Sequence, residues 1–523
     1  GTYWYHSHSK GQEQDGLYGP LVIYPKNKVP LTAGEKADRD YVVLLSDFHN
    51  STSGQIMSNL KKEADYYQNR RETVFDVFKQ IKRDGLKATW QDRSMWNQMR
   101  MLKTDMSDVT NYTFLMNGKT PEQNWTGNFK AGEKVRLRFI NASAMSFFDV
   151  RIPNLKMTVV SADGQPVKPV PVDEFRIGTA ETYDVIVEPK QANYQIEAES
   201  IDRSGFSVGT LHDENTTPVK NIVMPKPRPR SLLTMEDMGM DHDMSSMNGM
   251  DHDMSSMKSE SKDQSMSGMD HDMSSMKGMD HDMSSMKSDS KEQSMPGMDH
   301  DMSSMKGMDH DMSSMKSDSK DQSMSGMNHD MSAMNTNTSE TSDVVYGWAN
   351  ASTPVGQRAL KYSDLQSLNP QQDTRAPERE IEIRLGGNME RYIWTINGKK
   401  FNQTEPFKVK YGERIRLKFI NDSMMAHPMH LHGMFMQLEN GQDPSNMPNK
   451  HTVIVPPGKT VTTLLTADEL GEWAIHCHLL YHMSAGMMNK LIVANVDSNG
   501  TDMKDVVAQP KTNDKGVNQH AHH

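Results

Sequence analysis

Residues 476–487 read HCHLLYHMSAGM, and this stretch decides both the fold and the chemistry that the rest of the chain has to support. Successive side chains of a β-strand point to opposite faces, so His476 and His478 share one face and Cys477 lies on the other. The stretch therefore predicts a strand with a thiol on one side and a pair of imidazoles on the other. Cys477 is the only cysteine of the chain, so no disulfide within the chain uses that thiol.

The same stretch holds most of a copper ligand set. A blue-copper site has a cysteine, two histidines and a weakly bound axial methionine as ligands, and Cys477, His482 and Met487 supply three of these groups. The second histidine is expected from residues 427–433, which read HPMHLHG, because His427 precedes a proline and can turn toward this site. Zinc would also accept these donors, but the absence of a second cysteine favours copper.

Further histidines occur in pairs at the alternating spacing of a strand. The pairs are His6 and His8, His430 and His432, and His476 and His478. The first pair closes the segment GTYWYHSH, residues 1–8, which also reads as a strand. Imidazole pairs on coupled strand faces, together with the cysteine set, favour metal ligation over a purely structural role.

Composition narrows the class of protein. With 523 residues the chain is expected to form roughly two to four domains, because single cores rarely grow beyond about 250–300 residues. The net charge of -11 argues against a nucleic-acid-binding protein, which would need a basic face. No stretch is apolar over the length that a membrane span needs, so no membrane segment is expected.

Two regions of the chain are copies of one β-fold. Short alternating segments separated by Gly, Pro and Asn indicate antiparallel sandwiches. At an offset of 280, residues 117–119 match 397–399, residues 132–133 match 412–413, and residues 139–141 match 419–421. The extended alignment sets His427, His430 and His432 against Phe147, Val150 and Ile152. We therefore expect one sandwich used twice, with metal bound only in the second copy.

One part of the first copy reads as helical. Apolar residues recur at helical spacing before Gly85, namely Val74, Phe75, Phe78 and Ile81. Residues 89–92 are expected to open a second helix that carries Met95 and Met99. The pattern predicts a helical insertion over about residues 58–101.

A low-complexity segment separates the two copies. Of the 46 methionines, 26 lie between Met235 and Met334, and the unit GMDHDMSSM starts at positions 239, 249, 268, 278, 297 and 307. Without other apolar side chains such a segment cannot offset its ordering entropy, so residues 226–368 are expected to form a disordered insert. Thioether sulfur suits Cu(I), so the insert is expected to bind additional Cu(I); a plain linker is the alternative.

The chain resembles the multicopper oxidases, and among them the periplasmic copper-resistance oxidases of the CopA/PcoA type. The resemblance rests on residues 1–8, 427–433 and 476–487, and extends to the segments NWTG at 124–127, DVRI at 149–152 and DEFRI at 173–177, and to the Met/His insert. It covers nearly the whole chain. It implies an all-β fold of tandem cupredoxin-like Greek-key β-sandwiches and a periplasmic, monomeric protein.

The resemblance also implies the copper sites, up to four ions in the full-length protein. Type 1 copper would be held by His427, Cys477, His482 and Met487. Type 2 copper would be held by His430, and the type 3 pair by His6, His8, His432, His476 and His478. The implied domains are residues 1–30 as the end of a first cupredoxin domain, 31–225 as the second, 369–497 as the third, and 498–523 as a flexible tail.

Two departures from the family pattern stand out. The family's first His-x-His motif does not occur in the chain, which is therefore expected to be a fragment that lacks one type 2 and one type 3 ligand and has low turnover. Family members often have an acidic residue just after the type 1 histidine, where this chain has Met483 and Ser484.

The expected activity is oxidation of Cu(I) or phenolic donors at type 1 copper, coupled to four-electron reduction of O2 to water, in copper tolerance. Met95, Met99, Met434 and Met436 are candidates for receiving Cu(I). The alternative is a copper-sequestering protein with incidental oxidase activity. An electron-transfer cupredoxin or a two-domain nitrite reductase would not need the additional histidine pairs. Residues 520–523, HAHH, read as a weak metal-binding tail or an unrelated remnant.

Overall fold

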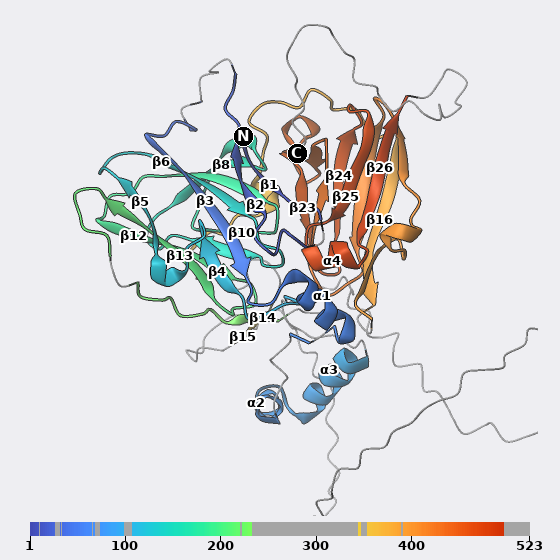
Figure 1. The fold of residues 1–523 in the computed structure, drawn as a ribbon, viewed down its shortest axis with the longest axis horizontal. Helices are drawn as coiled ribbons and strands as arrows, with labels where there is room; N and C mark the ends of the chain where they lie inside the picture. The colour runs from blue at the N-terminus through green and yellow to red at the C-terminus, as the bar shows by residue number, and fades with distance from the viewer. Residues whose placement is uncertain are drawn as a thin grey trace, which may run out of the picture. The chain divides into compact units, whose positions relative to one another are not determined.

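The computed structural model describes two β-sandwiches with a helical segment between two strands of the first (Figure 1). The described residues are 1–9, 11–26, 32, 34–64, 66–67, 74–98, 107–219, 222–232, 344–346, 353–388 and 391–495. All described elements belong to one compact unit of the chain. The Met/His repeats, Met99 and the tail 498–523 lie outside the described residues, so the expectations for them are untested.

The N-terminal sandwich has a six-stranded and a five-stranded sheet. The six-stranded sheet has the order β4 (Thr113–Met116), β3 (Arg39–Phe48), β6 (Val135–Asn141), β11 (Thr182–Val187), β8 (Met157–Ala162) and β9 (Gln165–Val172). The five-stranded sheet has the order β10 (Glu174–Ile177), β7 (Phe148–Arg151), β12 (Asn193–Ser200), β13 (Phe206–Asp213) and β5 (Trp125–Phe129).

The C-terminal sandwich, like the N-terminal one, has a six-stranded and a five-stranded sheet. Its six-stranded sheet has the order β17 (Ile393–Ile396), β16 (Arg379–Asn388), β19 (Arg414–Asn421), β24 (Thr460–Thr466), β21 (Met436–Leu438) and β22 (Asn449–Lys450). Its five-stranded sheet has the order β18 (Phe407–Lys410), β26 (Met488–Ala494), β25 (Gly471–Cys477), β20 (His427–Leu431) and β23 (Thr452–Val455).

The strand orders show that the two sandwiches are equivalent, as the sequence repeat predicts. The position of β6 in its sheet is that of β19, and β7 lies between β10 and β12 as β20 lies between β23 and β25. Val150 of β7 pairs with Ala198 of β12, whereas His430 of β20 pairs with His476 of β25. The apolar pair in one copy therefore takes the ladder position of an imidazole pair in the other.

A third, smaller element is the hairpin of β1 (Thr2–His6) and β2 (Tyr18–Val22). It packs on β6 and β11 of the N-terminal sandwich. Arg138 and Asp184 form an ion pair of 3.1 Å under the hairpin, and the Thr2 hydroxyl donates a hydrogen bond of 2.9 Å to Asp184. Because a buried charge has to be paired, this network fixes the hairpin that carries His6.

The helical insertion lies in the connection from β3 to β4, where the equivalent strands β16 and β17 are joined by residues 389–392 alone. Its helices are α1 (Ser53–Lys62), α2 (Val74–Asp84) and α3 (Leu86–Gln98), so the insertion starts before the predicted residue 58. Thr52 caps α1 by accepting a hydrogen bond from the Gln55 amide. The prediction rested on apolar spacing and did not consider this capping residue. The prediction that residues 89–92 open a helix was wrong, because α3 begins at Leu86 directly after Gly85.

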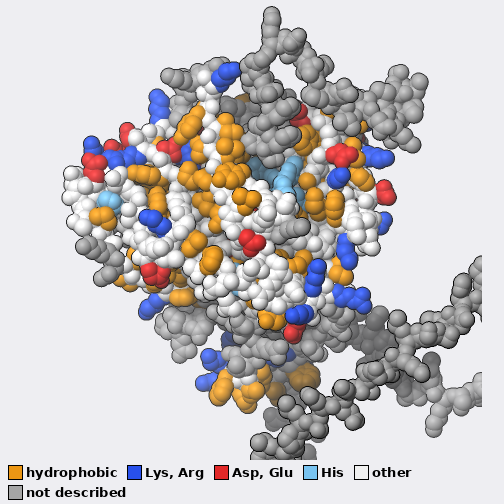
Figure 2. Space-filling model, in the orientation of Figure 1, with side chains coloured by type: hydrophobic (Ala, Val, Ile, Leu, Met, Phe, Trp, Pro, Cys, Tyr) orange, Lys and Arg blue, Asp and Glu red, His pale blue; other side chains and the backbone are white. Residues whose placement is uncertain are grey.

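The helices differ in burial. Ile56 and Leu60 of α1 are fully buried in the core of the C-terminal sandwich. Phe75 and Phe78 of α2 and Trp90 of α3 are exposed, and Figure 2 shows hydrophobic side chains gathered at the foot of the view, where Figure 1 places α2 and α3. Among the described side chains of these three helices, only those of α1 thus belong to a sandwich core. None of the helices that the structure describes is long and apolar enough to cross a membrane.

The segment 353–368 differs from its predicted disorder. Ala359 forms a bridge with Glu174 and Ser367 a bridge with Val167, and Leu365 is fully buried in the core of the N-terminal sandwich. The low-complexity insert therefore has to end before residue 353. Leu360 and Leu365 supply the apolar burial that the Met/Ser/Asp repeats lack.

Two further elements complete the described part. The strands β14 (Arg230–Leu232) and β15 (Val344–Tyr346) form a separate parallel pair, and Arg228 forms an ion pair of 2.7 Å with Glu199. The predicted disorder of residues 226–368 is therefore wrong for these residues as well. The helix α4 (Leu480–Ala485) connects β25 to β26.

Candidate metal centres

The first centre lies where β25 ends and β20 begins. The Cys477 Sγ atom lies 3.6 Å from His427 Nδ1 and 3.8 Å from His482 Nδ1, and the two Nδ1 atoms are 3.2 Å apart. All three side chains are fully buried. Their donor atoms therefore point at one another in the arrangement that a single ion requires.

Burial changes the pKa values of these groups in ways that suit the binding of a soft cation. It lowers the pKa of His427, and the neighbouring His482 lowers it further, so the ring stays neutral and keeps a lone pair for a metal. Burial also raises the pKa of the Cys477 thiol. The thiol proton is therefore released only when a cation takes its place.

Met487 lies beside this group because the chain reverses after α4. The amide of Cys477 donates to the Met487 carbonyl at 3.1 Å, and the amide of Met487 donates to the His482 carbonyl at 3.0 Å. Gly486 has a φ of 127°, and a Cβ at this position would lie 2.7 Å from the Trp394 carbonyl oxygen. Only glycine fits this return, which fixes the buried Met487 next to Cys477.

Two polar side chains orient the ligands of this centre. His482 Nε2 donates to Asp108 Oδ2 at 2.7 Å, and both side chains are fully buried. His427 Nε2 lies 2.7 Å from the Ser423 hydroxyl. Each ring thus has its Nε2 engaged and its Nδ1 directed at Cys477. Asp108 follows the helical insertion and belongs to no motif, so no sequence pattern identified it as a site residue.

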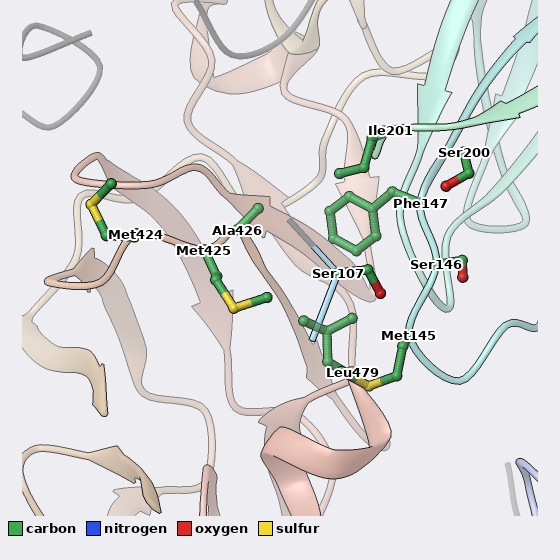
Figure 3. A pocket seen from close by; sticks show the side chains of 10 residues that line it. All are labelled: Ser107, Met145, Ser146, Phe147, Ser200, Ile201, Met424, Met425, Ala426 and Leu479. Carbon is green, nitrogen blue, oxygen red and sulfur yellow. The ribbon is translucent and has the colours of Figure 1, made fainter. Parts of the chain in front are cut away.

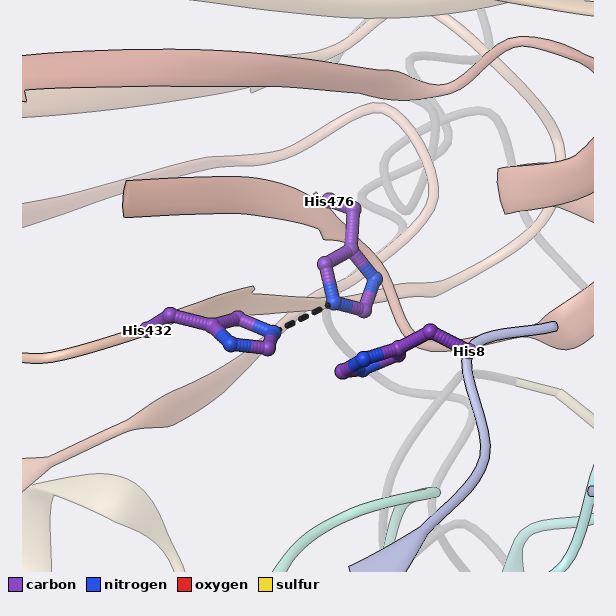
Figure 4. A group of neighbouring side chains, drawn as sticks. All are labelled: His8, His432 and His476. Carbon is purple, nitrogen blue, oxygen red and sulfur yellow. Dashed lines mark hydrogen bonds between the residues drawn. The ribbon is translucent and has the colours of Figure 1, made fainter. Parts of the chain in front are cut away.

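The second centre is a group of three histidines. His8, His432 and His476 have ring nitrogens within 4.8 Å of one another, and the Nε2 atoms of His432 and His476 are 3.1 Å apart. Figure 4 shows the three rings converging, with His8 reaching in from the segment after β1. Burial lowers the pKa of His476, so this ring is neutral as well.

The third group consists of His6 and Glu13 from the hairpin region and of His478, which directly follows β25. The Nε2 atoms of His6 and His478 are 3.2 Å apart, and Trp4 stacks on His6 with ring centroids 4.3 Å apart. Glu13 Oε2 lies 2.8 Å from His6 Nδ1. Glu13 was not among the predicted site residues.

His430 lies among these rings. Its ring centroid is 4.8 Å from that of His432, 5.5 Å from that of His476 and 5.6 Å from that of His478. His430 Nδ1 is within 3.0 Å of both the His451 carbonyl and the Thr452 hydroxyl. The structure therefore brings Cys477 together with His427 and His482, and brings the other six predicted histidines together in a second region, while Met487 is buried next to Cys477 along the backbone.

A pocket whose lining includes three methionines lies close to the thiol-containing group along the chain, since Ala426 precedes His427 and Leu479 follows Cys477 by two residues (Figure 3). Met425 and Met145 point toward Leu479, two residues after Cys477, whereas Met424 lies farther out. Ser107, next to Asp108, also lines the pocket. Met434 and Met436, which were candidates for receiving Cu(I), are instead packed in the sandwich core.

Comparisons with known proteins agree with this geometry. Family models described as multicopper oxidase match residues 1–28, 39–221 and 374–497. The chain is 47% identical over 498 residues to Copper resistance protein A of Escherichia coli, which covers 94% of the chain and 77% of that protein. It is 48% identical over 496 residues to Copper resistance protein A of Pseudomonas syringae pv. tomato, with the same coverage.

A solved structure supports the fold. The crystal structure of a multicopper oxidase that functions in iron import aligns with a TM-score of 0.52 at 15% identity, over 94% of this chain and 72% of that one. The predicted class of tandem cupredoxin-like sandwiches is confirmed.

Proposed function

Because the chain belongs to the multicopper oxidase family, and is thus a copper-dependent oxidoreductase, we propose that it oxidises Cu(I) with O2 as electron acceptor in copper tolerance. The proposal assigns type 1 copper to His427, Cys477, His482 and Met487. It assigns type 2 copper to His430, and the type 3 pair to His6, His8, His432, His476 and His478. The two sandwiches are assigned as the second and third cupredoxin domains, and a periplasmic location follows from the resemblance.

The donor sets fit copper. A buried thiol with two neutral imidazoles and a thioether suits one type 1 ion, and groups of neutral imidazoles suit the other sites. When bound, copper supplies the one-electron chemistry by which four electrons reduce O2 to water. The ligands also link the centres, since Cys477 lies between His476 and His478 in sequence and the path from thiol to imidazole runs through a few covalent bonds.

The observation that favours Cu(I) over a phenol as electron donor is the thioether-lined pocket beside Cys477. Thioethers select Cu(I) among the forms of copper, and Met145 and Met425 line the pocket from the two different sandwiches. Met424 is half-buried at its outer side and provides a first contact. Asp108 connects this region to His482 through a single hydrogen bond.

The test replaces the sulfurs and keeps the shape. The double variant Met145→Leu/Met425→Leu removes both thioethers at nearly constant volume, and Met157→Leu, fully buried in the N-terminal sandwich, is the matched control. In the holoenzyme we expect the KM for Cu(I) to rise about tenfold or more with unchanged kinetics for a phenol. Equal losses for both donors, or no change for Cu(I), would exclude this pocket as the donor site.

A second candidate function is Cu(I) binding by the Met/His repeats, which the composition of the insert favours. We propose that residues 235–334 bind several Cu(I) ions and raise the local Cu(I) concentration for the oxidase. Deletion should then weaken Cu(I) oxidation at low copper and leave phenol oxidation intact. If the insert is only a store, deletion reduces bound copper and changes neither activity.

A further inference from the structure

Glu13 contacts two of the assigned copper ligands on the side of each ring that faces away from their common point. Its Oε2 atom lies 2.8 Å from His6 Nδ1, and its Oε1 atom lies 4.0 Å from His478 Nδ1. The Nε2 atoms of the same two rings are 3.2 Å apart. The carboxylate is therefore within hydrogen-bond distance of Nδ1 of His6 and faces Nδ1 of His478 from farther away, while the two Nε2 atoms converge.

The burial of Glu13 calls for a positive charge nearby. The side chain is 1% exposed, and its ion pairs within the described part of the chain are with histidines alone. A carboxylate buried against imidazole rings is costly unless a cation compensates it, and ions at the Nε2 atoms would provide that charge.

The turn that carries Glu13 is held on both sides. Gln14 Nε2 donates to the Asp47 carbonyl at 3.0 Å, and Asp15 accepts hydrogen bonds from the amide and hydroxyl of Ser53 at 2.9 and 2.7 Å. Ser53 is the first residue of α1, so the turn is tied both to β3 and to the helical insertion. Glu13 is thereby fixed before any ion binds.

We propose that Glu13 is a positioning residue of the type 3 copper pair: it accepts the Nδ1 proton of His6, and so directs the Nε2 lone pair of that ring at copper, while its charge also faces Nδ1 of His478. A hydrogen bond from the second ring nitrogen to a carboxylate fixes the tautomer and the orientation of a ligand histidine. The inference rests on the proposed copper assignment. It gives a function to a residue that has no place in the His-x-His motifs.

The test compares Glu13→Gln with Glu13→Asp in the full chain. Total copper per chain is measured by Cu(II) titration against a competing chelator, and type 1 copper separately by its thiolate absorption. We expect Glu13→Gln to keep the type 1 band and to weaken copper binding at the histidine group about 10–100-fold. Glu13→Asp keeps the charge but has a shorter side chain. Its copper affinity at the histidine group should therefore lie between that of Glu13→Gln and that of the unchanged chain.

Controls separate positioning from stability. Glu197→Gln removes a buried carboxylate that is paired with Arg151 at 2.8 Å, away from the histidines, and should change neither copper signal. Wild-type copper binding in Glu13→Gln would overturn the proposal. So would a parallel loss of type 1 copper and melting temperature, since that would show a role in folding. Failure of the proposed function itself would appear differently, as absent copper in the unchanged chain.

Discussion

Asp108 orients His482, a ligand that we propose for type 1 copper. Its Oδ2 atom accepts hydrogen bonds from His482 Nε2 and from the Tyr392 hydroxyl, each at 2.7 Å. Trp394 stacks on the same imidazole with ring centroids 3.9 Å apart. The ring of His482 is thus held by a charge at one edge and by an aromatic face, and the negative charge favours the higher oxidation state of an ion at Nδ1.

We expect Asp108→Asn to raise the reduction potential of type 1 copper, because an amide keeps an acceptor oxygen and loses the charge that stabilises Cu(II). A redox titration of the thiolate absorption measures the potential. The exposed pair of Asp422 and Arg384 offers the control Asp422→Asn. Identical potentials in Asp108→Asn and the unchanged chain would show that the carboxylate does not act on the copper.

The candidate ligands could be predicted from the sequence, whereas the carboxylates that orient them could not. His476, Cys477 and His478 owe their directions to strand alternation, which is a local property. Asp108 and Glu13 meet their histidines only through the tertiary fold: Asp108 is separated from His482 by the whole insert and most of the C-terminal sandwich. A lone Asp or Glu in a loop has no local pattern that distinguishes it from a solvated one.

The helical insertion combines one structural helix with two exposed ones. Ile56 of α1 is buried in the core that also contains Cys477 and Met487. The apolar side chains whose spacing predicted α2, such as Phe75 and Phe78, are exposed. Helical periodicity predicted the existence of these helices, but it cannot show whether a neighbouring surface covers them.

We expect Ile56→Ala to cost about 2–5 kcal/mol of unfolding free energy, because it opens a cavity in the core of the C-terminal sandwich. Replacing Val74–Gln98 by a short Gly/Ser linker should cost little and leave the type 1 absorption intact. Denaturant unfolding followed by tryptophan fluorescence, with copper absorption as a second probe, measures both. A larger loss for the deletion than for Ile56→Ala would show that α2 and α3 support the sandwich.

The end of β3 carries a pH-sensitive carboxylate. Asp47 accepts hydrogen bonds from the amides of Ala144 and Met145 and from the Ser146 hydroxyl. Burial raises its pKa to about 7, against the opposing effect of these bonds. Between the ordinary carboxyl pKa and this value the folded chain holds a proton that the unfolded chain releases, so the contribution of Asp47 to stability falls as pH rises.

We therefore expect the melting temperature of the unchanged chain to fall between about pH 5 and pH 7 more steeply than that of Asp47→Asn, by the slope that one proton contributes. The amide variant is less stable at low pH, since its NH2 group cannot accept from Met145. Thermal melts at several pH values measure the difference. Parallel pH profiles for the two proteins would contradict the prediction.

At the scale of the whole molecule, a buried ion triad joins the two sandwiches. Lys450 Nζ lies 3.0 Å from Asp163 Oδ2 and 3.1 Å from Glu181 Oε1, and all three side chains are 0% exposed. Asp163 also accepts hydrogen bonds from the amides of His451 and Thr452. Because His430 Nδ1 contacts these two residues, the triad helps to set the position of His430, the ligand that we propose for type 2 copper.

The duplication could be recognised in the sequence, but the buried ion triad between the two sandwiches could not. Offset alignment finds what the copies share, and the Asn-Gly-Lys and Phe-Ile-Asn matches mark equivalent turns and strands. Lys450 and Tyr362 have no matching residue at that offset, where they face Val170 and Lys82. Tyr362 comes from the segment after the insert and donates a hydrogen bond of 2.5 Å to Glu181, although composition had placed that segment with the disordered repeats.

Lys450→Met should be among the most destabilising single changes in the chain, with an expected loss of about 3–5 kcal/mol, because it leaves two buried carboxylates without their cation. Lowering the pH should restore part of the stability, since protonation then removes the uncompensated charge. The matched triple variant Lys450→Met/Asp163→Asn/Glu181→Gln removes every charge and should recover most of the loss. Denaturant unfolding of the copper-free proteins at two pH values measures all three. If the triple variant is as unstable as Lys450→Met, packing around the lysine chain, and not charge compensation, holds the two sandwiches together.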